Sequence, residues 1–266
     1  GTAVLGLLVA AANPDGLSFS AFMQKKILDP LAMTSSVFPS RLRPAQVGDA
    51  LWSKTSRGYT AFGGVQLETL PLLLEEYPAG GLLSTPADHL RLLLAMLNGG
   101  RLGDTRLLSR ESVESMLSPA LSGSITHYGV PVPGEQQGLI WWLRDWSQEG
   151  RAFHHAGGYM FGWRTMGIAW PEYGAALVVA ENQWSIPHDQ RLHPALESIV
   201  KAWLVNLPPR LPPGEPAGIA DAAWKASYLR GFVFMEAYRS GLGLVAPVPA
   251  ERLAAVARGA VTADGA

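Results

Sequence analysis

Residues 151–182, RAFHHAGGYMFGWRTMGIAWPEYGAALVVAEN, constrain the fold more than any other stretch of the chain. Alternating, β-branched and aromatic residues fill 163–170 and 175–179, and the sequence PEYG at 171–174 between them is typical of a turn. An earlier run ends in HHAGG at 154–158. The pattern predicts three β-strands joined as a meander.

The end of the first predicted strand has the composition of a functional site. Gly157 and Gly158 directly after an apolar strand weaken a sheet, so they mark a bulge or a place where another backbone or a ligand comes close. A histidine beside such an opening can carry a proton at neutral pH. Because neighbours on a strand face opposite ways, only one of His154 and His155 can face the opening. We interpret this strand as one wall of an active site.

Composition narrows the class of protein. The 266 residues, 48% of them hydrophobic, suffice for one α/β domain with an appendage. A formal charge of −1 gives no reason to expect nucleic acid as a partner. The chain has no cysteine, and its longest apolar runs, 3–12 and 92–97, are shorter than the roughly 20 residues that span a bilayer. His127, His188 and His193 show no metal-ligand spacing, and we expect neither a metal nor a cofactor.

The first third of the chain predicts two helices and a long loop. Residues 2–12 are small and apolar on nearly every side, which favours a buried helix. Ser18 is typical of the cap of a second helix over 19–28. From 39 to 74, scattered glycines and polar residues predict a loop.

The clearest helix signals lie in residues 77–100, YPAGGLLSTPADHLRLLLAMLNGG. Thr85 is a capping residue, Pro86 suits the first helical position, Asp88 suits the positive end of the helix dipole, and two glycines end the helix. The predicted buried stripe consists of Leu90, Leu93, Leu94 and Leu97. Further on, we expect a short helix from Ser109 to about 117, a strand over 138–146 and an amphipathic helix over 188–204.

The composition changes after residue 205. The segment NLPPRLPPGEPAG, 206–218, holds five prolines and predicts a stiff linker. Residues 219–266 predict a helical appendage of unknown role. We therefore expect one domain over 1–205, the linker and the appendage.

Three blocks of the sequence carry a family resemblance. They are GTAVLGLLVAAANPDGLSFSAFMQKKILDPLAMTSSVF, the YPAGG–LNGG segment above, and FHHAGGYMFGW with the strand that follows it. In their order and spacing they resemble the C-terminal two thirds of a β-lactamase-like serine hydrolase, the family that holds class C β-lactamases, D-alanyl-D-alanine carboxypeptidases and related esterases. The resemblance implies an α/β (α+β) fold with an antiparallel sheet flanked by helices.

The resemblance also implies a reaction and a site. In this family a Ser-x-x-Lys helix supplies nucleophile and base, and a Lys-Thr-Gly or His-x-Gly strand lines the opposite wall. His155 would hold the position of that Lys or His, and the backbone N–H of Gly158 would be one of two oxyanion-hole donors. Gly157, Tyr159 and Tyr77 would contact the substrate, an ester, peptide or β-lactam. A periplasmic or secreted location is implied without being fixed.

Some family features are missing or altered. No Tyr-x-Asn occurs, and the only Ser-x-x-Lys is Ser198 to Lys201, which follows the third motif and which we interpret as ordinary helix surface. The turn after His155 is one residue longer than usual before its closing Gly162. We therefore expect the nucleophile on an N-terminal fragment or chain that completes the fold. The alternatives are a non-catalytic scaffold or ligand-binding module, and a truncated product.

Overall fold

The computed structural model describes residues 1–40, 44–62, 65–69, 77–121, 126–127, 130–131, 135–146, 150–159, 162–184, 202–203 and 206. Its helices are α1 (Thr2–Ala12), α2 (Phe19–Met23), the π-helical turn η1 (Gln24–Leu28), α3 (Pro44–Val47), α4 (Asp49–Trp52), α5 (Tyr77–Gly80), α6 (Pro86–Leu97) and α7 (Arg110–Met116). Its strands are β1 (Gly58–Phe62), β2 (Val65–Thr69), β3 (Arg101–Leu102), β4 (Thr105–Arg106), β5 (Thr126–His127), β6 (Val130–Pro131), β7 (Glu135–Gln137), β8 (Trp142–Trp146), β9 (Gly150–Tyr159), β10 (Trp163–Trp170), β11 (Ala175–Glu181) and β12 (Gln183–Trp184).

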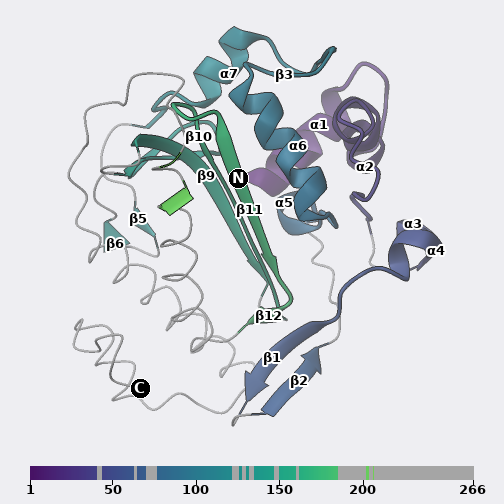
Figure 1. Cartoon of the computed structure of the whole chain (residues 1–266). Helices are drawn as coiled ribbons and strands as arrows, with labels where there is room; N and C mark the ends of the chain where they lie inside the picture. Colours follow the sequence, from purple (N-terminus) through teal and green to yellow (C-terminus); the bar gives the residue numbers. More distant parts are fainter. Residues whose placement is uncertain are drawn as a thin grey trace.

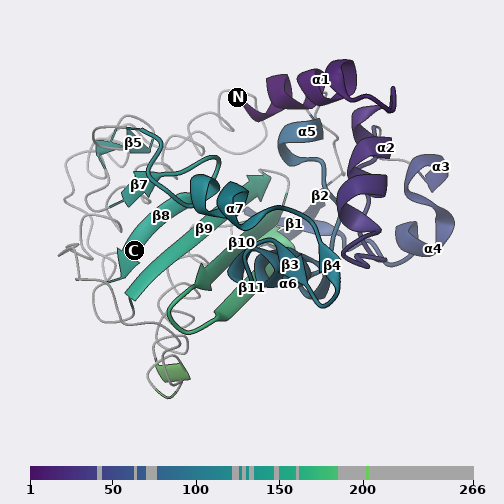
Figure 2. The ribbon, with the colours of Figure 1, turned by 90° about the horizontal axis from the view of Figure 1, so that it is seen from above.

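A five-stranded sheet in the order β11-β10-β9-β8-β7 forms the centre of the fold. Every neighbouring pair is antiparallel. Strands β9, β10 and β11 are the predicted meander, and the predicted turn closes on Gly174, which has a φ of 61°. Figure 2 shows the strands as one layer with α6 and α7 against it. The expected antiparallel sheet flanked by helices is thus confirmed.

Helix α6 begins and ends where the sequence predicted. The hydroxyl of Thr85 accepts a hydrogen bond from the Asp88 N–H at 3.2 Å, with proline in the first turn. Its burial differs from the predicted leucine stripe: Leu93 is fully buried, whereas Leu94 is 37% exposed. Leu93 and Met96 pack toward the sheet with Phe153, and Ala95 packs toward η1, so α6 is buried on two sides.

Asp88 has a structural role beyond the helix dipole. Its carboxylate accepts hydrogen bonds from the Ser35 N–H and the Ser36 hydroxyl, both at 2.8 Å. The Ser36 hydroxyl also lies 2.7 Å from that of Ser84. This buried network ties the segment after η1 to the start of α6, and it agrees with reading Asp88 as a helix-start residue.

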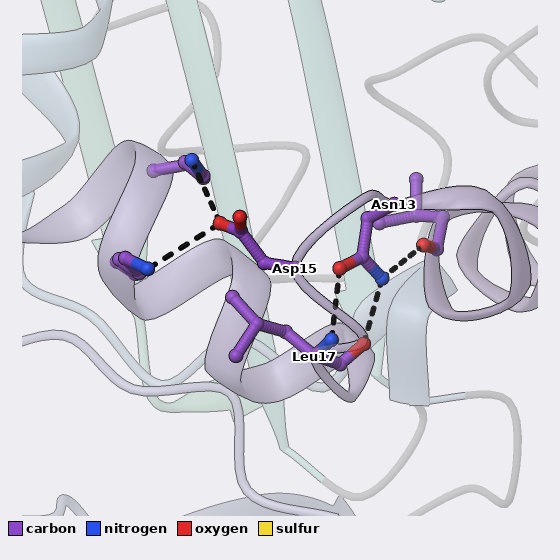
Figure 3. Close-up of polar contacts among 6 residues, drawn as sticks. Asn13, Asp15 and Leu17 are labelled. Atoms are coloured by element: carbon purple, nitrogen blue, oxygen red, sulfur yellow. Dashed lines mark hydrogen bonds and ion pairs between the residues drawn. The ribbon is translucent and has the colours of Figure 1, made fainter.

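The turn between α1 and α2 is held by side chains (Figure 3). The Asn13 amide donates to the carbonyls of Val9 and Leu17 at 2.7 and 2.8 Å and accepts from the Leu17 N–H at 2.8 Å. Asp15 pairs with Lys26 at 3.0 Å and with Lys25 at 3.3 Å. The predicted cap also forms, since the Ser18 hydroxyl accepts from the Ala21 N–H. These contacts fix the angle between the two helices.

Helix α1 forms as predicted, but the expectation that it is buried is wrong. Only Gly6 is buried, in contact with Pro78, while four apolar side chains of α1 are between 47% and 70% exposed. These are Val4, Leu5, Leu7 and Leu8. An all-round apolar sequence indicates that a helix can be buried without specifying what covers it. We call these four side chains the α1 apolar face.

The predicted loop over 39–74 is also wrong in part. It contains α3, α4 and the hairpin of β1 with β2, and β1 pairs in parallel with β12. The Tyr59 N–H donates to the Asn182 carbonyl at 2.8 Å, so this small sheet joins the end of the central sheet (Figure 1). Strand β1 has only five residues, and its parallel partner lies more than 100 positions away, so the local sequence pattern does not predict the strand. The predicted strand over 138–146 begins later, at Trp142, because Ile140 adopts a positive φ of 74°.

The close contact between Gly162 and β1 leads to a stability prediction. Gly162 has a φ of 110°, and a Cβ there would lie 2.3 Å from the Tyr59 backbone nitrogen. Gly162→Ala should therefore lower the free energy of unfolding by about 2–3 kcal/mol. An alanine is strained at this φ, and its Cβ would clash with the backbone of Tyr59, which cannot rotate away as a side chain could. Gly48→Ala is the matched control, because Gly48 has a φ of 85° with nothing within 4 Å, and it should cost about 1 kcal/mol. Equal losses in urea unfolding would show that the contact contributes nothing.

Several expectations lie outside the described residues. These are the helix over 188–204, of which only two positions are described, the linker over 206–218, of which only Asn206 is described, and the appendage over 219–266. In the part of the chain that the structure describes, no helix is long and apolar enough to cross a membrane.

Candidate active site

The open end of β9 is the feature that defines the candidate site. Strand β8 pairs with β9 only as far as His154, whereas β10 accompanies β9 to Tyr159. Among the described residues, no strand pairs with the β8 side of β9 beyond His154. Residues 155–159 therefore present a strand edge to which an extended ligand can be added.

The two neighbouring histidines lie on opposite faces of the sheet. His154 is 5% exposed and pairs with Ile168, which packs in the cluster of Ala152 and Trp170. His155 is exposed and lies directly opposite Gly167 on the α6 side. The structure thus makes His155 the accessible imidazole at the open edge.

Trp142 fixes the position of the His155 ring. The indole of Trp142, at the start of β8, stacks on the His155 imidazole. The ring centroids are 5.0 Å apart and the ring planes meet at 14°. The same indole meets His154 edge-on at 5.3 Å. The imidazole of His155 is therefore covered on one face although the residue is exposed.

The predicted site residues on β9 follow His155 in order. Gly157 and Gly158 are both exposed and pair with Thr165 and Arg164 of β10. A Cβ at Gly157 would lie 3.1 Å from the Thr165 hydroxyl, so only glycine leaves that position open. Tyr159 lies at the end of the same strand, and the structure does not describe its side chain.

Tyr77 lies in a different part of the fold from the other candidates. It begins α5, and its ring meets Phe19 of α2 edge-on at 5.8 Å. Its backbone carbonyl also accepts the Gly81 N–H at 2.7 Å. These contacts pack Tyr77 among the helices, and its role in substrate binding stays a prediction.

His89 is a further candidate for the site, which the sequence did not indicate. It lies in the first turns of α6, and its Nε2 is 3.1 Å from the place where a Cβ of Gly167 would be. Gly167 is the residue opposite His155, so His89 approaches the sheet at the position that pairs with His155. The available signal was a histidine three positions after the helix start, and the helix pattern gave it no particular role.

The imidazoles at this edge are poor bases. Burial against neighbouring groups lowers the pKa of His155 below its usual value, and the charge of His154 lowers it further. Burial is also the main cause of the lowered pKa of His89, followed by the charge of His155. Both side chains are therefore largely uncharged at neutral pH.

These lowered pKa values predict how stability depends on pH. The folded protein binds fewer protons at His89 and His155 than the unfolded chain does, so the free energy of unfolding should fall as pH decreases from about 7.5 to 5.5. At pH values well above the pKa of histidine in the unfolded chain, neither state binds these protons, and this loss of stability is absent. In the double variant His89→Gln with His155→Gln the slope should be shallower, as measured by urea unfolding at fixed ionic strength. An unchanged slope would contradict the assignment.

With this geometry in view, comparison with known proteins identifies the family. A sequence model of the family described as Beta-lactamase matches residues 1–201. The chain belongs to the beta-lactamase family. The resemblance in the three sequence blocks is thereby confirmed, and the match covers both β9 and α6.

Solved structures agree with the beta-lactamase fold. The chain is similar to an octameric penicillin-binding protein homologue from Pyrococcus abyssi, with a TM-score of 0.55 and 22% identity over 74% of this chain and 41% of that one. It is similar to a class C beta lactamase from Rhodobacter sphaeroides, with a TM-score of 0.56 and 16% sequence identity. That match covers 76% of this chain and 59% of the other. It is also similar to a beta-lactamase from Sulfitobacter sp. EE-36, with a TM-score of 0.55 and 18% sequence identity. That match covers 76% of this chain and 58% of the other.

The chain spans between 41% and 59% of the length of these three structures. No curated protein matches it. At these identities the structural likeness establishes the beta-lactamase fold alone.

Proposed function

We propose that this chain is part of a serine hydrolase that attacks ester, peptide or β-lactam carbonyls and proceeds through an acyl-enzyme. The observation that carries the proposal is the exposed His155, followed by two exposed glycines, on the open edge of β9 in a beta-lactamase fold. His155 and Gly157 form the His-x-Gly wall. An extended substrate aligned with this edge would place its carbonyl near the backbone N–H of Gly158, the proposed oxyanion-hole donor.

The nucleophile in this proposal lies outside these 266 residues. A serine of a Ser-x-x-Lys helix attacks the carbonyl carbon and its proton passes to the neighbouring base. The base then gives this proton to the leaving group, which departs as the tetrahedral intermediate collapses to the acyl-enzyme. Water then attacks the acyl-enzyme, and its proton returns through the same base to the serine. One oxyanion-hole donor is typically worth about 3–4 kcal/mol in the transition state.

The α1 apolar face supports the presence of a second segment. Four neighbouring apolar side chains on one helix form the kind of exposed surface that marks an interaction site. We infer that the segment carrying the nucleophile covers this face and completes the sheet. A stable monomer of the purified 266-residue chain, with the α1 apolar face open to solvent, would contradict this part of the proposal.

The test is covalent labelling of the protein as isolated from its source, with a fluorophosphonate and with a penicillin probe. We expect the adduct on a serine outside residues 1–266, located by peptide mass spectrometry, on a segment that accompanies this chain. Ser198→Ala is the control and should leave labelling unchanged. An adduct on Ser198 would overturn the placement of the nucleophile. A folded protein that neither probe labels would favour the non-catalytic scaffold.

A further inference from the structure

Strand β2 forms the free edge of the small sheet. The strand order there is β12-β1-β2, and among the described residues no strand pairs with the outer side of β2. Residues 65–68 are all exposed. Figure 1 shows the hairpin of β1 and β2 beyond the end of the central sheet, apart from α6 and α7. An exposed edge of this kind offers unpaired backbone groups to another strand.

The pairing of β1 determines which backbone groups of β2 point outward. The Tyr59 N–H donates a hydrogen bond on the β12 side of β1, away from β2. Because the direction of the backbone groups alternates along a strand, the next residue, Thr60, directs its N–H and C=O toward β2, where its partner is Leu67. Gln66 and Glu68, on either side of Leu67, therefore direct theirs to the free edge.

A second copy of β2 fits this edge in an antiparallel register centred on Leu67. The register places Gln66 opposite Glu68 of the second copy, and Glu68 opposite Gln66 of the second copy. Both become hydrogen-bonded pairs, so the outward N–H and C=O groups of both residues are used. Within Val65–Thr69, a register centred on Gln66 or on Glu68 uses only one of the two residues. The register centred on Glu68 also sets two carboxylates directly opposite each other, which is destabilising.

The apolar side chains of β2 agree with the register centred on Leu67. Leu67 meets Leu67 of the second copy, and Val65 meets Thr69, both in the non-hydrogen-bonded pairs whose side chains lie closest. In the single chain Val65 is 59% exposed and Leu67 is 47% exposed. Pairing buries part of both side chains, and this burial favours association.

The polar side chains on the other face of β2 are also complementary. Glu68 is paired with Arg57 at 3.0 Å, so its charge is partly neutralised before a second strand arrives. The Gln66 amide donates one N–H to Gln183 at 3.0 Å and has a second N–H for the Glu68 carboxylate of the second copy. Strand β2 also has no proline or lysine of the kind that commonly blocks an edge strand.

We propose that two copies of this chain associate through β2, antiparallel and centred on Leu67, so that their small sheets join into one continuous sheet. The arrangement has two-fold symmetry, and each strand makes the same contacts to the other. The occupant is a second copy because the strand is complementary to itself in its hydrogen-bonding groups, its apolar side chains and its charges. Strands of five residues bury a small area, so the dimer is weak and forms as the concentration rises. This surface lies on a different sheet from the open edge of β9.

The first test is sedimentation velocity of the 266-residue chain from about 10 µM to about 1 mM. The weight-average mass should rise from that of one chain toward that of two. Gln66→Pro should abolish the rise, because proline removes an outward N–H and its ring blocks the edge, whereas the bonds between β1 and β2 do not use that N–H. Gln66→Ser is the matched control, since it loses the same amide contact to Gln183 but keeps the N–H. Its dimer should have a Kd within about tenfold of wild type.

The second test measures the register by disulfide cross-linking. The chain has no cysteine, so a single introduced cysteine reports its own position. With oxidised glutathione as the oxidant, Leu67→Cys should form a disulfide between two copies, because residue 67 lies opposite itself at a Cα separation within disulfide range. Val65→Cys should not, because in this register the two copies of residue 65 are about 14 Å apart along the strands. Mixing Val65→Cys with Thr69→Cys should restore the cross-link.

Three results would overturn the proposal. The first is a chain that stays monomeric up to about 1 mM. The second is equal cross-linking of Leu67→Cys and Val65→Cys. The third is a dimer that persists in Gln66→Pro, and if Leu7→Ser disperses that dimer, it belongs to the α1 apolar face instead. Thermal unfolding shows whether each variant is folded, and if Gln66→Pro is not, the cross-linking variants decide alone.

Discussion

In the proposed serine hydrolase, replacing His155 with glutamine should slow acylation by the penicillin probe by about 100-fold or more. His155 is the accessible imidazole at the open edge of β9, and the stacked indole of Trp142 holds its ring in place. Removing a positioned group that transfers or orients a proton typically costs about 10²–10⁴ in rate. The rate should be measured at about pH 8, where the neighbouring imidazoles are uncharged.

His154→Gln is the matched control for this prediction. It makes the same chemical change one residue away, but His154 is buried on the other face of the sheet. Acylation should stay within a few-fold of wild type. Equal losses in the two variants, accompanied by lower thermal stability, would mean that the fold rather than the site was damaged. An unchanged rate in His155→Gln would remove His155 from the active site.

Leu93→Ala should lower the free energy of unfolding by about 2–5 kcal/mol. Leu93 is fully buried between the helix and the sheet, where it packs with Phe153 and Ala169 and also borders Gly167. The substitution removes apolar contact and leaves a cavity that the rigid strands cannot close. Urea unfolding of the purified chain measures the loss.

Leu94→Ala tests the same helix on its exposed side. Leu94 is 37% exposed, so its replacement should lower the free energy of unfolding by only about 1 kcal/mol, less than the loss in Leu93→Ala. The simple leucine stripe predicted from the sequence treats the two leucines alike. Similar losses in both variants would therefore support that stripe and contradict the packing seen in the structure.

Much of the architecture was predictable because its signals are local. Ser18, Thr85 and Ser109 each cap the helix that was predicted to follow, and each hydroxyl accepts an N–H only three residues away. The meander follows from alternation within single strands and from a four-residue turn. The glycines after His155 also marked the open edge, since few other reasons place two glycines at the end of an apolar strand.

Contacts between distant segments were not predictable in the same way. The hairpin of β1 and β2 depends on pairing with β12, and the sequence around β1 does not indicate this distant partner. The burial of α6 depends on two separate clusters, so a single stripe described it poorly. The exposure of the α1 apolar face likewise depends on what does or does not lie against the helix.

The candidate site also combines features set by neighbouring residues with features set by contacts between distant segments. The sequence by itself determined that a histidine and two glycines end a strand, and that the strand belongs to a meander, because alternation and backbone freedom are properties of neighbouring residues. Only the tertiary structure decided that His155 rather than His154 is accessible, and that His89 of α6 lies in the space at Gly167, the residue opposite His155. The register between β9 and β10 and the position of α6 over them are fixed by packing across the whole domain, and that packing brings His89 to this part of the sheet.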